Sequence, residues 1–225
     1  MSPQHSYLKL TAMNRKLALL GLFILPLALS AQKNDTIQTL PGRFTLGVRA
    51  TTSLFSHDNG APGFGGGGQF RILVHERVNT EWFADVIFTD IGGLAKRQDF
   101  HIGWSVMFYV LKPKNFQRKF LPYIVAGNCF DLTRITVNKR PDDNFTRFSS
   151  AVQLGAGVHY NITPKWDISF TAQYMWHLGG ELHTHEHDGE IEIEEHDEVS
   201  FEGHLLLNLS INYKIAQLWK NKRKK

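Results

Sequence analysis

The chain has 225 residues and carries 25 Lys and Arg against 21 Asp and Glu, a formal net charge of +4. This length accommodates one domain or one membrane barrel. The positive balance does not indicate nucleic-acid binding, because Lys9, Arg15 and Lys16 precede the predicted mature chain and five more cations lie in residues 216–225. Cys129 is the only cysteine, which excludes an internal disulfide, and we interpret it as a small apolar residue within a strand.

Residues 1–31 are predicted to form a signal peptide. A basic start precedes an apolar run, Leu17–Leu29, which ends in small residues suited to cleavage. The run is too short for a membrane-spanning helix and Pro26 interrupts it, which argues against an uncleaved anchor. Residues 1–12 are interpreted as an upstream extension, because a second methionine directly precedes the basic residues. No later stretch approaches the roughly 18 apolar residues of a membrane helix, so the exported chain either stays soluble or crosses a membrane as a barrel.

Beyond a predicted periplasmic linker at residues 32–42, apolar and polar residues alternate along eight segments. Alternation with a period of two is typical of strands that have one apolar and one polar face. The eight segments are Arg43–Ser53, Gly65–His75, Thr80–Thr89, Phe100–Leu111, Leu121–Leu132, Arg147–Asn161, Trp166–His177 and Val199–Tyr213. We therefore predict an all-β fold, an eight-stranded antiparallel up-and-down transmembrane β-barrel over residues 43–215, followed by a basic C-terminal tail at 216–225.

The polar faces of these segments carry charged, amide and imidazole side chains. They are Arg49, Arg71, Glu81, Asp85, Gln153, His159, Gln173, Glu202 and His204. In lipid each charge would cost about 2–4 kcal/mol at the bilayer midplane, so we expect these faces to point into the barrel. The lumen of an eight-stranded barrel is just wide enough to be filled by side chains. The sequence therefore predicts a lumen filled by paired side chains rather than a conduction path.

The connections between the segments alternate in length. The short ones are Glu76–Asn79 and Ile162–Lys165, and the longer polar ones are His57–Phe64, Asp131–Thr146 and Leu178–Glu198. Short periplasmic turns and long outer loops are typical of outer-membrane barrels, and an even number of strands places both termini in the periplasm. Two connections depart from this rule, because Lys112–Phe120 is long for a turn and Ile91–Asp99 is only moderate for a loop.

The last long connection differs from ordinary barrel composition. Residues 178–198 contain nine carboxylates and four histidines, with no Lys or Arg. Within them, Asp188-Gly189 is a strong signal for a two-residue type I′ turn. The pairs that this turn places opposite one another, all on one face, are His187 with Glu190, His185 with Glu192 and His183 with Glu194.

The same register can be carried into the barrel. It pairs Gln173 with His204 and Trp166 with Ile211, so that polar meets polar and apolar meets apolar. We therefore interpret the last two barrel strands as one long hairpin that projects past the membrane. Gly179-Gly180 is the point at which a bulge would break this register.

Three interpretations of this His/Glu hairpin remain open. Imidazoles two residues apart on a strand share a face and suit zinc, copper or nickel, while facing carboxylates add oxygen ligands. The candidate ligands of such a divalent transition metal are His183, His185, His187, Glu190, Glu192 and Glu194. A row of histidines also suits a pH response or partner binding, because imidazole titrates near neutrality. The third interpretation is a solvated polar tip. No other cofactor is expected, and no catalytic residue is identified.

Four blocks of sequence resemble the small outer-membrane β-barrel proteins common in Bacteroidota, which are broadly similar to the transmembrane domain of outer membrane protein A. They are the leader ending in LSAQ, then FTLGVRA, LPYIVAGNCFD and VQLGAGVHYNITPKWDISFTAQYMW. The resemblance implies contact with outer-membrane lipid and insertion by the outer-membrane assembly machinery, and it assigns no functional residue. The chain departs from such barrels after Tyr213, because twelve residues follow the aromatic residue that the assembly machinery reads in them.

We favour an integral, monomeric outer-membrane barrel with a structural or surface-interaction role, without enzymatic activity and without nucleic acid as a partner. One alternative is a soluble secreted barrel that binds a ligand inside, as lipocalins do, and its interior would be apolar. Another is a membrane-embedded lipid-modifying enzyme, which would need a Ser or His with an acid at the outer rim. The sequence shows no nucleophile motif, and the direction of the apolar face decides between the first two.

Overall fold

The computed structural model describes residues 41–55, 61–113, 118–138, 140–178, 181–187, 190–196 and 203–219. The chain divides into two units, Met1–Ile37 and Gln38–Lys225, and every described residue belongs to the second. The predicted signal peptide, Glu202 and the Asp188-Gly189 turn lie outside the described residues. No helix among the described residues is long and apolar enough to cross a membrane.

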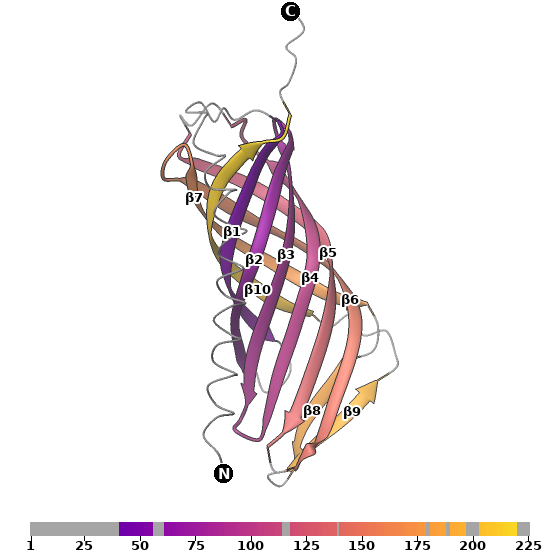
Figure 1. Cartoon of the computed structure of the whole chain (residues 1–225). Helices are drawn as coiled ribbons and strands as arrows, with labels where there is room; N and C mark the ends of the chain where they lie inside the picture. The colour runs from indigo at the N-terminus through magenta and orange to yellow at the C-terminus, as the bar shows by residue number, and fades with distance from the viewer. Residues whose placement is uncertain are drawn as a thin grey trace, which may run out of the picture. The chain divides into compact units, whose positions relative to one another are not determined.

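Eight antiparallel strands close into a barrel in the order β1-β10-β7-β6-β5-β4-β3-β2 (Figure 1), which confirms the predicted fold class. Their bounds are β1 Arg43–Phe55, β2 Pro62–His75, β3 Val78–Ile91, β4 Ala95–Tyr109, β5 Phe120–Val137, β6 Arg140–Asn161, β7 Trp166–Leu178 and β10 Gly203–Gln217. β8 (Glu181–His187) and β9 (Glu190–His196) form a separate two-stranded sheet.

The barrel has two distinct ends. At the terminal end, β1 begins and β10 finishes, because Arg43 pairs with Gln217 where the ring closes. At the opposite, hairpin end, β3 turns into β4 and β5 into β6, and the chain leaves β7 toward β8. Both described ends of the barrel chain therefore lie on one side, as an even number of strands requires.

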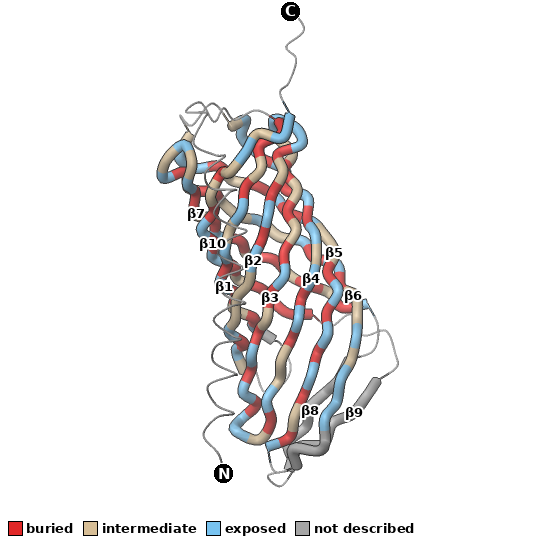
Figure 2. Tube along the Cα trace, viewed as in Figure 1, coloured by how far each residue is buried: buried red, intermediate tan, exposed pale blue. Residues whose placement is uncertain are grey.

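Buried and exposed residues alternate along the barrel strands (Figure 2). The inward residues are odd-numbered on β1 to β7 and even-numbered on β10, and the apolar side chains of the opposite parity are exposed outside, as Trp104 and Phe170 are. The residues predicted to point inward and found buried are Arg49, Arg71, Glu81, Asp85, Gln153, His159, Gln173 and His204. The prediction that charged and polar side chains point inward is confirmed, and the alternative with a polar exterior is wrong.

The strands at the hairpin end are longer than predicted. β5 runs to Val137 and β6 starts at Arg140, so most of the predicted loop Asp131–Thr146 is paired strand. β3 likewise meets β4 through a tight turn within the predicted loop Ile91–Asp99. Gly92 and Gly93 adopt φ of 59° and 72° in that turn, the left-handed region that glycine reaches without strain. Beyond the apolar belt the pattern reverses: Ile91, Ala95 and Ile135 are apolar and buried inside, while polar residues such as Arg134 are exposed outside.

The pairing of β7 with β10 differs from the prediction by two residues. Gln173 pairs with Leu206 rather than His204, and Trp166 pairs with Tyr213 rather than Ile211. A shift of two leaves every side chain on its predicted face, whereas a shift of one would reverse them all. The error therefore changes the neighbours and not the orientation.

Close packing of β2 against β3 depends on glycine. A Cβ atom added at Gly65 or Gly67 would collide with the backbone carbonyl oxygen of Val86 or Ala84 on β3. Both glycines have inward parity, and their missing side chains leave room beside Asp85. Gly65 and Gly67 are thus structural requirements of the barrel wall.

Candidate functional site

The lumen contains a layer of apolar side chains in mutual contact, which we call the central apolar layer. It consists of Phe83, Ile87, Cys129, Ala151, Met175 and Leu206. These residues come from β3, β5, β6, β7 and β10, so the layer reaches across the lumen between strands that are not neighbours in the ring. Cys129 is fully buried in it, which confirms its interpretation as an apolar filler.

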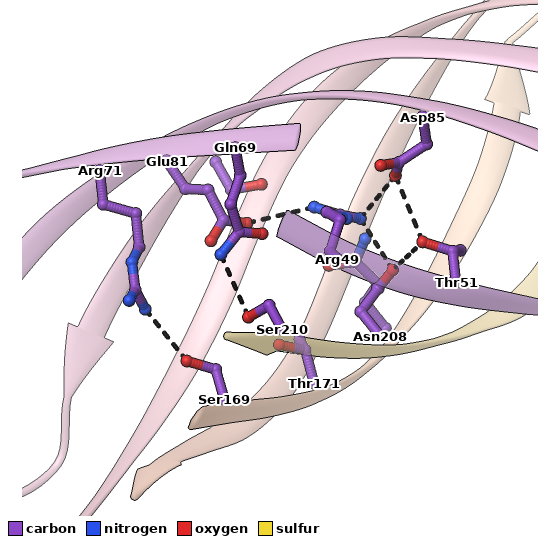
Figure 3. Close-up of polar contacts among 12 residues, drawn as sticks. Arg49, Thr51, Gln69, Arg71, Glu81, Asp85, Ser169, Thr171, Asn208 and Ser210 are labelled. Atoms are coloured by element: carbon purple, nitrogen blue, oxygen red, sulfur yellow. Dashed lines mark hydrogen bonds and ion pairs between the residues drawn. The ribbon is translucent and has the colours of Figure 1, made fainter. Parts of the chain in front are cut away.

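A buried ion-pair network lies toward the terminal end. Arg71 donates from Nη2 to Asp167 Oδ1 at 2.7 Å and from Nη1 to Ser169 Oγ at 3.1 Å (Figure 3 shows the latter). Lys214 Nζ lies 3.8 Å from Asp167 Oδ2 and donates to Asn161 Oδ1 at 2.8 Å. The charge of Asp167 is thus balanced by two cations from strands β2 and β10.

A second ion-pair network centres on Arg49. Its Nη2 lies 2.9 Å from Asp85 Oδ2 and donates to Asn208 Oδ1 at 2.8 Å, while Nη1 lies 3.5 Å from Glu81 Oε1 (Figure 3). The guanidinium carbon is 4.4 Å from the ring centroid of Phe83, within the range of a cation–π contact. Phe83 therefore joins the central apolar layer to this network.

Three histidines and a carboxylate meet in the lumen toward the hairpin end. His101 Nε2 lies 3.4 Å from Asp131 Oδ1, and His177 Nδ1 lies 3.7 Å from Asp131 Oδ2. The ring of His204 is 5.0 Å from that of His177 and 5.9 Å from that of His101. Of these, sequence reasoning identified only His204 as inward. His101, Asp131 and His177 also occupy inward positions in the alternating pattern of their strands, but no sequence motif indicates that they meet.

The structure also describes the backbone of the predicted His/Glu hairpin. β8 and β9 pair His187 with Glu190, His185 with Glu192 and His183 with Glu194, which confirms the predicted register. Residues two apart on a strand share a face, so the backbone places these six residues on one side of the hairpin. Among the residues whose side chains are described, no group of three or more His, Cys, Asp or Glu is arranged to hold a metal ion. The side chains of 181–196 lie outside that set, and the metal interpretation stays a prediction.

The family model of the outer membrane protein beta-barrel domain matches residues 17–191. The chain belongs to this outer-membrane barrel family. It is therefore a protein of the outer membrane, and its exposed apolar belt is the surface that contacts lipid. No curated protein sequence matches the chain.

The chain is also similar to several solved structures. Neisserial surface protein A superposes with a TM-score of 0.52 at 16% identity, covering 76% of this chain and 96% of that one. The N-terminal β-barrel domain of Pseudomonas aeruginosa OprF gives a TM-score of 0.49 at 12% identity, with 75% and 96% covered. Ail, the attachment invasion locus protein of Yersinia pestis, gives 0.48 at 11%, with 77% and 99% covered.

Proposed function

We propose that this outer-membrane barrel is a closed, monomeric membrane anchor with a structural or surface-interaction role, inserted by the outer-membrane assembly machinery. The observation that supports the proposal is the central apolar layer, whose side chains contact one another across the lumen. Hydrated ions could cross it only by displacing closely packed side chains. The elements that such an anchor presents are the extended β3–β4 and β5–β6 hairpins and the β8–β9 hairpin.

The proposal predicts that the folded protein does not conduct ions. Single-channel recording in planar bilayers with concentrated KCl is expected to show no stable unitary current from the heat-modifiable, folded fraction. A known porin refolded in the same detergent is the positive control, and the heat-unfolded fraction is the negative one. Current steps of constant amplitude that appear only with the folded fraction would contradict a closed anchor.

The lumenal residues also support a non-enzymatic role. Ser169, His159 and Asp167 lie together, which is a combination found in hydrolases. All three are buried, however, and Arg71 Nη1 lies 3.0 Å from His159 Nδ1. A cation so close to the imidazole opposes the proton uptake that a catalytic base must perform. A lipid substrate has no described route to Ser169, so we infer that this cluster stabilises the barrel.

A second candidate function is capture of a divalent transition metal by the His/Glu hairpin, and the β8–β9 register favours it. Titration of Zn²⁺ or Ni²⁺ into the refolded barrel, followed by calorimetry, is expected to show tighter binding than to a variant with His183, His185 and His187 changed to Ala. Since loss of supporting groups alone weakens metal sites by about 10–100-fold, loss of three ligands is expected to exceed tenfold. The control is His75→Ala, an exposed histidine at the terminal end. Equal affinity in the triple variant would exclude the site.

A further inference from the structure

The outward apolar face ends at one level on three neighbouring strands at the hairpin end. Phe100 on β4 pairs with Leu132 on β5, which pairs with Phe148 on β6, and all three side chains are exposed outside. The next outward residues along these strands are all polar: Gln98, Arg134 and Thr146, which also form a row of cross-strand pairs. The apolar belt thus ends at the same height on all three strands, and a row of polar residues lies directly beyond it.

The height of this edge matches the edge of the hydrocarbon layer. Phe120 at the terminal end of β5 and Leu132 are both exposed outside, and twelve residues separate them. At about 3.3 Å per residue and a tilt of about 40°, they are roughly 30 Å apart along the membrane normal, close to the height of a barrel's apolar band. Arg134 therefore lies where lipid headgroups begin.

Two cations share this polar edge. Arg134 pairs with Gln98, and Lys96 pairs with Thr136, so Lys96 and Arg134 are diagonal neighbours on adjacent strands. Diagonal positions are about 7–8 Å apart, within reach of long side chains. Both are exposed, and neither makes an ion pair or a hydrogen bond with a side chain that the structure describes.

Among the described residues on this outward face, one acid stands against the two cations, which leaves a net positive charge. The described acid on the same outward face is Asp90, which is opposite Lys96 across the β3–β4 pair. By contrast, the neighbouring Arg97 donates to the buried Asp99 at 2.9 Å. Lys96 and Arg134 thus give the polar side of the apolar edge a net positive charge, with the amide of Gln98 and the hydroxyls of Thr136 and Thr146 beside them.

We propose that Lys96 and Arg134 bind the phosphate of an anionic membrane lipid whose chains lie against the Phe100–Leu132–Phe148 edge. The guanidinium group binds phosphate oxygens in bidentate geometry, and the ammonium adds a second positive charge. The methylene stems of both side chains can lie along the apolar edge while their charges stay at the headgroups. This site goes beyond the proposed anchor function and does not depend on it.

Native mass spectrometry of the detergent-solubilised barrel tests the site with phosphatidylglycerol as the probe and phosphatidylcholine as the zwitterionic comparison. The wild type is expected to retain phosphatidylglycerol preferentially. Because each cation near a membrane surface contributes about 1 kcal/mol, the double variant Lys96→Gln/Arg134→Gln is expected to bind phosphatidylglycerol about thirtyfold more weakly. Arg134→Lys keeps the charge but loses the bidentate geometry, and an intermediate affinity is expected.

The matched control is Lys112→Gln/Lys165→Gln, which removes the same charge at the terminal end. Heat-modifiable gel migration verifies that each variant is folded. An equal loss of affinity in both double variants would overturn the proposal, because it would show only a general attraction between net charge and anionic lipid. Displacement of the lipid by inorganic phosphate alone would assign the site to free anions instead and would equally overturn it.

Discussion

Replacing Arg71 with Met is expected to lower the free energy of unfolding by about 3–5 kcal/mol, the usual cost of removing one partner of a buried ion pair. Asp167 would keep Lys214, at 3.8 Å, as its cation and the amide of Asn212, at 3.0 Å, but would lose the 2.7 Å bond from Arg71. Ser169 would also lose a donor. Urea unfolding in lipid vesicles, followed by tryptophan fluorescence, measures the change.

Two further variants separate the ion pair from a general effect of charge loss at Arg71. Arg77→Met, in the turn between β2 and β3, is expected to cost less than about 1 kcal/mol, because an exposed or half-exposed cation contributes little. Asp167→Leu is expected to cost at least as much as Arg71→Met, because it leaves both Arg71 and the buried Lys214 without their carboxylate. If Arg71→Met matched the Arg77 control, the buried network would not stabilise the barrel.

Phe83→Ala is expected to destabilise the barrel by about 3–5 kcal/mol, the usual range for a buried aromatic residue. Phe83 is only 4% exposed, belongs to the central apolar layer and lies under the Arg49 guanidinium. Its removal would leave a cavity inside the lumen that neighbouring strands cannot close. The same unfolding experiment measures the loss.

Phe88→Ala is the matched control for this change. Phe88 lies on the same strand as Phe83, but its side chain is 55% exposed on the lipid face. Lipid chains can fill the space that Phe88 leaves, so a much smaller loss is expected. Losses of equal size would show that the lumenal layer contributes no more than lipid contact does.

The odd or even position of a residue along its strand determined what could be predicted from the sequence about the barrel wall. A residue such as Arg71 or His159 must point inward once its strand spans lipid, because the alternative places a polar group in hydrocarbon. The same rule fails where the membrane ends. In the strand extension from Thr133 to Val137, which pairs with β6, Ile135 and Val137 are apolar and buried inside and Arg134 is exposed outside, because lipid no longer covers the outer face there.

Parity also explains the error in register. Gln173 can pair with His204 or with Leu206 without changing the face of any side chain, so hydrophobic pattern cannot distinguish the two. Turn chemistry at Asp188-Gly189 was sufficient to predict the β8–β9 pairs. The two-residue difference arises between the hairpin and the barrel, where the pattern carries no information.

The lumenal histidine cluster could not be predicted for a different reason. His101 on β4 and His204 on β10 belong to strands that do not pair, and they meet only because the barrel closes. Their contact depends on the diameter and stagger of the whole ring. Strand patterns and pairwise registers, which relate adjacent strands, do not contain that information.

The separation of β8–β9 from the barrel sheet has an evolutionary consequence. No ladder hydrogen bond joins the two sheets among the described residues, so the hairpin has its own register and its own turn. Substitutions between Glu181 and His196 are therefore expected to leave the strand pairing of the barrel wall unchanged. Such a segment can diversify rapidly under selection while the wall that carries it is conserved.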